Sequence, residues 1–99
     1  MRRAARTDAN QPAIVAALRA VGASVQHLAA VGDGVPDLLV GWQRRLNLLM
    51  EVKDSAKAPS DRRLTPAQFL WHREWRGTVE VVTTVEEALN VLGLGRAAP

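Results

Sequence analysis

Two runs of alternating apolar residues, joined by a short polar turn, constrain the fold of this chain more than any other feature. The runs cover residues 37–42 and 46–53, with the turn at residues 43–45. Successive side chains of a strand point to opposite faces, so pairing Trp42 with Leu46 gathers one apolar set on a single face. That set is Leu38, Val40, Trp42, Leu46, Leu48, Met50 and Val52. A slip of one residue would send charged side chains to this face, and the pattern therefore predicts a β-hairpin of defined register.

The same register brings three charged residues together at the open end of the hairpin. Asp37 then faces Glu51, and Lys53 points to the same side as Glu51. Opposed residues of paired strands have Cβ atoms about 5 Å apart. Two carboxylates at that distance repel each other, and a divalent cation keeps both ionised. The hairpin therefore predicts an oxygen-ligand metal site beside a lysine, an arrangement typical of hydrolytic centres.

Length and composition limit the classes of protein that fit. A chain of 99 residues with 47% hydrophobic residues is expected to form one domain. Cysteine is absent, which excludes disulfides and thiolate metal sites and is compatible with a reducing, cytoplasmic setting. No apolar run approaches the ~20 residues of a membrane span, and the basic start lacks the apolar segment of a secretory signal. The net charge of +3 comes mainly from arginine and permits nucleic-acid binding, although composition alone favours a solvated surface as its explanation.

The pattern along the chain predicts a small α/β domain with a mixed sheet flanked by helices. The expected order is helix, strand, hairpin, helix, strand, helix (α-β-β-β-α-β-α), with a parallel return to the last strand. Residues 1–9 are expected to form a flexible basic arm, residues 10–93 the domain and residues 94–99 a tail. Within the domain we expect helices at 12–21, 66–76 and 84–93, strands at 24–30 and 79–82, and a mobile polar loop at 54–63. Asn10 is the expected cap of the first helix, which ends at Gly22.

The second helix carries two polar residues one turn apart, Gln68 and His72. Thr65 followed by Gln68 is a capping-box pattern, so a capping role and a role in the charged site are both open for this glutamine. Trp71 and Trp75 share the helix; packing in the core is their ordinary role, and stacking on an unpaired base is the alternative.

These features together resemble the PD-(D/E)XK nuclease superfamily, and more narrowly the small stand-alone VRR-NUC nucleases of phages and bacteria. The resemblance extends over residues 8–92. It rests on the residues 34–40, on the triplet Glu51-Val52-Lys53, and on Gln68 and His72. It implies a restriction-endonuclease-like core and a metal-dependent DNA nuclease, here expected to be an endonuclease.

By this resemblance, Asp37, Glu51 and the backbone carbonyl of Val52 bind Mg²⁺ or Mn²⁺. Lys53 orients the attacking water or stabilises negative charge, and Gln68 flanks the site. His72 stands where relatives carry tyrosine, so its role stays open. Relatives also place a glutamate on the first helix; this chain has only Asp8, Asn10 and Gln11 nearby, which suggests one well-held metal.

The expected partner is DNA, with branched or junction DNA among the candidate substrates. Residues expected to contact phosphates are Lys57, Arg62, Arg63, Arg44, Arg45 and Arg73, each of which has a solvated charge as its alternative. A domain this small leaves little surface for substrate selection, which favours a homodimer as a hypothesis. The alternatives to a nuclease are a non-catalytic DNA-binding module on a nuclease fold and an interaction subunit.

Overall fold

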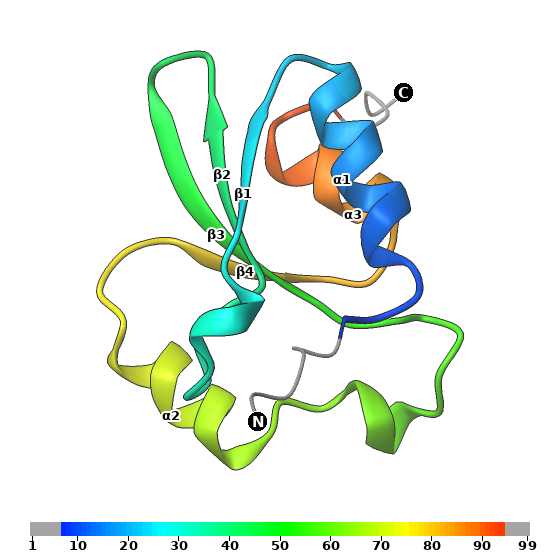
Figure 1. The fold of residues 1–99 in the computed structure, drawn as a ribbon, viewed down its shortest axis with the longest axis vertical. Helices are drawn as coiled ribbons and strands as arrows, with labels where there is room; N and C mark the ends of the chain where they lie inside the picture. Colours follow the sequence, from blue (N-terminus) through cyan, green and yellow to red (C-terminus); the bar gives the residue numbers. More distant parts are fainter. Residues whose placement is uncertain (1–6, 95–99) are drawn as a thin grey trace.

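Four strands form one mixed sheet in the order β1-β2-β3-β4 (Figure 1). The strands are β1 (Ser24–His27), β2 (Leu38–Trp42), β3 (Leu46–Val52) and β4 (Val79–Val82). Neighbours pair antiparallel from β1 to β3, while β4 runs parallel to β3. The structure, a computed structural model, describes residues 7–94, so most of the predicted arm and tail lies outside the described residues. The predicted mixed sheet and its parallel return are confirmed.

Three α-helices flank the sheet: α1 (Gln11–Ala20), α2 (Pro66–Glu74) and α3 (Val85–Val91). α1 and α3 lie side by side against one face, whereas α2 lies apart from them below the sheet (Figure 1). Two 3₁₀ turns, at Ala29–Val31 and Pro59–Arg62, complete the order. The predicted order of helices and strands is therefore confirmed.

The hairpin adopts the predicted register, with Trp42 opposite Leu46 and Leu38 opposite Met50. Its apolar face packs on α1 and α3 and forms the core, together with Ile14 and Leu18 of α1. Leu46 is the exception: it is 47% exposed, because it sits next to the turn, where no helix covers the sheet.

The hairpin turn is strained at two positions. Gln43 and Arg44 adopt φ angles of 55° and 56°, the left-handed region expected of a type I′ turn. Residues with a Cβ enter this region at a cost of about 1–2 kcal/mol each. The apolar pattern of the two strands fixes their register, and this register holds the turn in its conformation.

The strand expected at 24–30 and the helix expected at 66–76 both end earlier than predicted. The strand expected over 24–30 ends at His27, because the Leu28 N–H donates to the Asp37 carbonyl and the Val31 N–H then turns back to Leu28. α2 ends at Glu74 rather than at residue 76, because Trp75 is extended and its ring returns to stack on Trp71. The loop over 54–63 contains a 3₁₀ turn that starts at a proline.

Asn10 does not cap α1 through its side chain, contrary to the prediction. Its Nδ2 instead donates to the carbonyl of Lys53 at 3.0 Å and to the carbonyl of Thr83 at 2.9 Å. These carbonyls follow the ends of β3 and β4. The side chain therefore joins the start of α1 to the edge of the sheet where the charged residues lie.

Candidate active site

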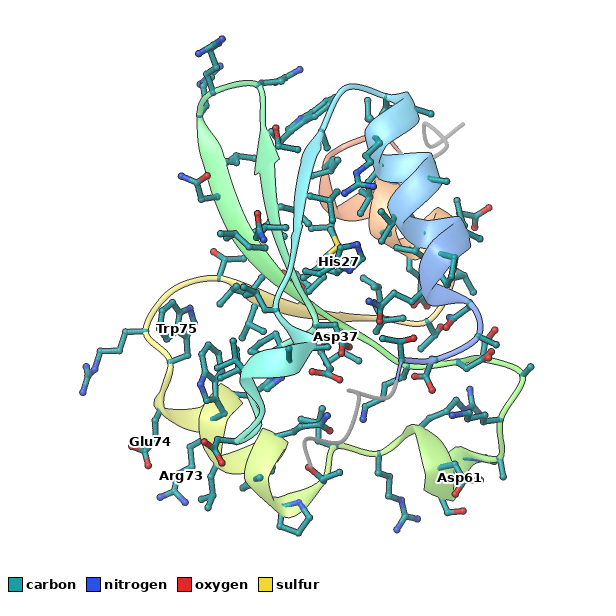
Figure 2. The ribbon with its side chains drawn as sticks, in the orientation of Figure 1. His27, Asp37, Asp61, Arg73, Glu74 and Trp75 are labelled. Carbon is teal, nitrogen blue, oxygen red and sulfur yellow. The ribbon has the colours of Figure 1, made fainter. Side chains whose placement is uncertain are left out.

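Asp37 and Glu51 meet at the open end of the hairpin, as the register requires. Asp37 directly precedes β2, near the middle of the molecule in Figure 2. Its Oδ2 accepts a hydrogen bond of 2.7 Å from the Val52 N–H, and its carbonyl accepts one of 2.8 Å from the Leu28 N–H. These bonds hold Asp37 against both neighbouring strands at the point where regular pairing of β2 ends.

Glu51 is a buried acid with one oxygen left free. Its side chain lies in a face of β3 covered by α2, and the residue is 2% exposed. Oε2 accepts a hydrogen bond of 3.0 Å from Gln68 Nε2 and lies 3.7 Å from Lys53 Nζ. Oε1 is buried and has no hydrogen-bond partner within residues 7–94. An unpaired buried carboxylate oxygen is costly unless something else binds it.

The pKa of Glu51 is raised from 4.5 to about 8. Burial is the largest cause, followed by the nearby carboxyl group of Asp37, while the charge of Lys53 lowers the pKa in part. Without a cation, this pair therefore holds a proton at neutral pH.

Lys53 lies beside the carboxylate of Glu51 and is only 8% exposed. Its Nζ donates to Gln68 Oε1 at 2.7 Å, and its backbone N–H donates to the Val82 carbonyl at 2.9 Å. The parallel pairing of β3 with β4 thus continues one residue beyond β3 and directs this ammonium group into the site.

Gln68 fulfils both of the roles left open by the sequence. As a capping residue, its Oε1 accepts from the Thr65 N–H at 2.9 Å, and the Thr65 hydroxyl accepts from the Gln68 N–H. As part of the site, the same amide bridges Glu51 and Lys53. The start of α2 is thereby anchored to the end of β3.

Gly34 sets how closely α2 approaches the loop before β2. Its φ is +83°, and a Cβ added there would lie 2.3 Å from the carbonyl oxygen of Ala67 and 2.9 Å from the amide nitrogen of Gln68. Only glycine accommodates both the backbone angle and this contact. The glycine therefore helps to place Gln68.

A cavity of about 400 Å³ opens over these groups. Its lining comprises Thr7, Asp8, Asp37, Glu51, Val52, Lys53, Lys57 and Gln68. The donors of Asp37, Glu51 and the backbone at Val52 are all oxygens, the ligands preferred by Mg²⁺ and Mn²⁺. Glu51 has a buried carboxylate oxygen without a hydrogen-bond partner in the described residues, and its pKa is raised. Both features are expected of a two-carboxylate cation site in which no cation balances the negative charge. The residues present therefore fit a divalent cation.

Asp8 lines the cavity but is paired with a base. The Lys57 ammonium forms an ion pair with its carboxylate, and this raises the pKa of Lys57. Within the described residues, no group of three or more His, Cys, Asp or Glu side chains is arranged to hold a metal.

His72 lies outside the lining of this cavity. Its ring is edge-on to Trp71, and its Nε2 is buried without a partner in the described part of the chain. Burial, and then the charge of Lys53, lowers its pKa, so the imidazole is neutral at pH 7. The ring is therefore near enough to Lys53 for that charge to lower its pKa, but it does not line the cavity that holds the carboxylates.

The predicted phosphate contacts fall into three separate places. Lys57 lines the cavity, and Arg62 and Arg63 follow on the same loop. Arg73 lies near the end of α2 and points outward (Figure 2). Arg44 and Arg45 sit in the hairpin turn, roughly 20 Å from the carboxylates at ~3.4 Å per strand residue. The last two are thus at the opposite end of the sheet.

Sequence reasoning missed the tether formed by Asn10 and the contact made by Gly34. Both depend on residues far along the chain, 43 and 73 positions away for the asparagine. Its local setting, before a proline at a helix start, indicated only a cap. The glycine and proline cluster around residue 34 marked a turn but not what the turn would touch.

Within residues 7–94, no helix is long and apolar enough to cross a membrane.

No family model matches the sequence, and no curated protein matches it. Among solved structures, one described as a VRR_NUC domain is similar, with a TM-score of 0.63 and 28% sequence identity. The similar region covers 84% of this chain and 89% of that one. The chain therefore has a VRR-NUC-like nuclease fold.

Proposed function

We propose that this protein is a metal-dependent DNA nuclease that hydrolyses phosphodiester bonds. One observation carries the proposal: Glu51 is buried beside Asp37 and Lys53 with a carboxylate oxygen that has no hydrogen-bond partner among the described residues. A buried carboxylate oxygen without a partner is costly in a purely structural role, and a bound cation would satisfy it. The similarity to a structure described as a VRR_NUC domain supports the same conclusion.

Each residue of the site has a distinct task in this proposal. Asp37, Glu51 and the Val52 carbonyl would hold Mg²⁺ or Mn²⁺. Such a cation lowers the pKa of bound water and neutralises charge on the phosphoryl oxygens. The Lys53 ammonium is held beside Glu51 by Gln68, where it can orient a water molecule or stabilise the negative charge that develops on the phosphate.

DNA is the proposed substrate because of the VRR-NUC-like fold and because arginines lie on the loop beside the site. Lys57 lines the cavity, and Arg62 and Arg63 follow on the adjoining loop. Contacts of this kind add affinity without sequence preference, and they weaken steeply as salt rises. We extend the proposal to endonucleolytic cleavage of branched or junction DNA by a homodimer. The substrate panel below tests the preference for branched DNA, and sedimentation tests the dimer.

The test is cleavage of labelled duplex, single-stranded, flap and four-way-junction DNA with Mg²⁺, Mn²⁺ or EDTA. We expect metal-dependent cutting that Lys53→Ala and Glu51→Gln abolish. Glu86→Gln is the matched control, since Glu86 is an exposed glutamate in the first turn of α3 and should cut like the wild type. Salt-sensitive DNA binding without cutting on any substrate would instead support the non-catalytic binding module.

A further inference from the structure

A second cavity, of about 370 Å³, lies between α2 and the sheet. Its lining is mainly apolar and comprises Leu28, Val35, Leu39, Asn47, Leu48, Leu49, Trp71, Trp75, Gly77 and Thr78. Pockets that hold small ligands have volumes of about 300–1,000 Å³, mostly apolar walls and a few polar groups. Here Asn47 and Thr78 supply the polar side chains.

This cavity continues the face of the sheet that carries the carboxylates. Leu39 follows Asp37 by two residues on one arm of the hairpin, and Leu49 precedes Glu51 by two on the other. Residues two apart on a strand point to the same face and are separated by roughly 7 Å. The cavity therefore begins directly beside the candidate active site, and α2 borders both.

The outer wall of the cavity is a pair of stacked indoles. The rings of Trp71 and Trp75 are 4.7 Å apart and inclined by 19°. Trp75 is 47% exposed, and Gly77 leaves room for its indole, since a Cβ there would lie 2.7 Å from Nε1. In Figure 2, Trp75 turns back toward the sheet while Arg73 and Glu74 point outward.

Charged side chains of both signs lie near these rings. Arg73 and Arg76 line a hollow at the end of α2 together with Glu74, and the two indoles also border a hollow that contains Asp33 and Glu74. Aromatic rings interleaved with arginines are the usual means of binding an unpaired nucleic-acid strand: the rings stack on bases and the arginines contact phosphates.

We propose that the Trp71–Trp75 cavity binds one unpaired nucleobase next to the phosphate that is cut. This inference rests on the proposed nuclease function. The planar apolar walls match the face of a base, and Asn47 and Thr78 offer hydrogen bonds to its edge. The substrate class is then DNA with a single-stranded nucleotide at the cleavage site. A fully paired duplex would have to unstack a base first, at a cost of a few kcal/mol.

The test measures binding rather than cutting, with the wild-type protein in EDTA. The probes are a labelled oligothymidylate, an abasic strand of the same length and a duplex. We expect tighter binding of the oligothymidylate than of the other two. Trp75→Ala should weaken its binding about ten-fold, within the range of base–aromatic stacking, and leave abasic binding unchanged. Trp75→Phe should retain most of the affinity.

Phe69→Ala is the matched control, because Phe69 is an exposed aromatic residue on the same helix outside this cavity. It should bind every probe like the wild type. Equal binding of normal and abasic strands would overturn the base pocket while leaving the nuclease proposal intact. Loss of dimer mass on sedimentation of Trp75→Ala, without any dependence on bases, would show that a second copy covers the cavity. Absence of binding to all probes would overturn the base pocket, while the metal-dependent cleavage assay above decides the nuclease proposal separately.

Discussion

The stability of the metal-free protein should fall as pH rises, because of Glu51. The folded state raises the pKa of this carboxyl to about 8, while the unfolded chain has the ordinary value of 4.5. Between these values the folded protein holds a proton that the unfolded chain has released. The stabilisation is therefore complete below about pH 4.5 and is lost as pH rises through 8.

The size of the effect follows from the shift. A difference of about 3.5 pKa units corresponds to roughly 5 kcal/mol at most, at 1.36 kcal/mol per unit. A domain of this length has a total stability of about 5–15 kcal/mol. The metal-free wild type should therefore lose a large part of its stability by pH 9. Glu51→Gln carries no proton to lose and closely resembles the protonated acid, so it should escape this loss.

Urea unfolding in EDTA from pH 5 to pH 9 measures the difference. The two proteins should be equally stable at pH 5, and Glu51→Gln should be more stable by several kcal/mol at pH 9. Glu86→Gln, at an exposed site, should follow the wild type throughout. Adding Mg²⁺ at pH 9 should restore the wild type and not Glu51→Gln, since a ligand of the folded state alone stabilises it. Parallel curves for wild type and Glu51→Gln would refute the reasoning.

Three further changes test the supports of the site. Gly34→Ala should destabilise the fold and reduce cleavage, because its methyl group collides with the first turn of α2. Gly32→Ala is the control, since Gly32 has a similar positive φ but no described atom within 4 Å of an added Cβ. Comparing the two variants in urea unfolding and in cleavage separates the effect of the collision from that of the backbone angle. Gln68→Ala and Thr65→Ala should each cost about 1 kcal/mol through the lost cap, but only Gln68→Ala should also depress cleavage. Asn10→Ala should cost about 2–3 kcal/mol in urea unfolding, since two carbonyls lose their donor.

Local sequence patterns predicted the elements whose stabilising contacts lie within a few residues or within one pair of neighbouring strands. The hairpin register followed from the period-two alternation, because a shift by one residue would bury charge. The cap of α2 followed from Thr65 and Gln68, whose capping hydrogen bonds reach only the backbone of their own turn. The boundary at His27 is set by a partner outside the strand, the carbonyl of Asp37, and α2 ends at Glu74 where the Trp75 ring returns to stack on Trp71 of the same helix.

By itself, the sequence determined that Asp37, Glu51 and Lys53 would share one end of a hairpin, because strand pairing is a short-range geometric rule. Only the tertiary structure decided what surrounds them. The burial that raises the pKa of Glu51, the tether from Asn10 and the cavity beneath Trp75 arise where segments distant in the chain pack together. Desolvation depends on the whole arrangement of neighbours in space, and no local pattern of residues encodes it.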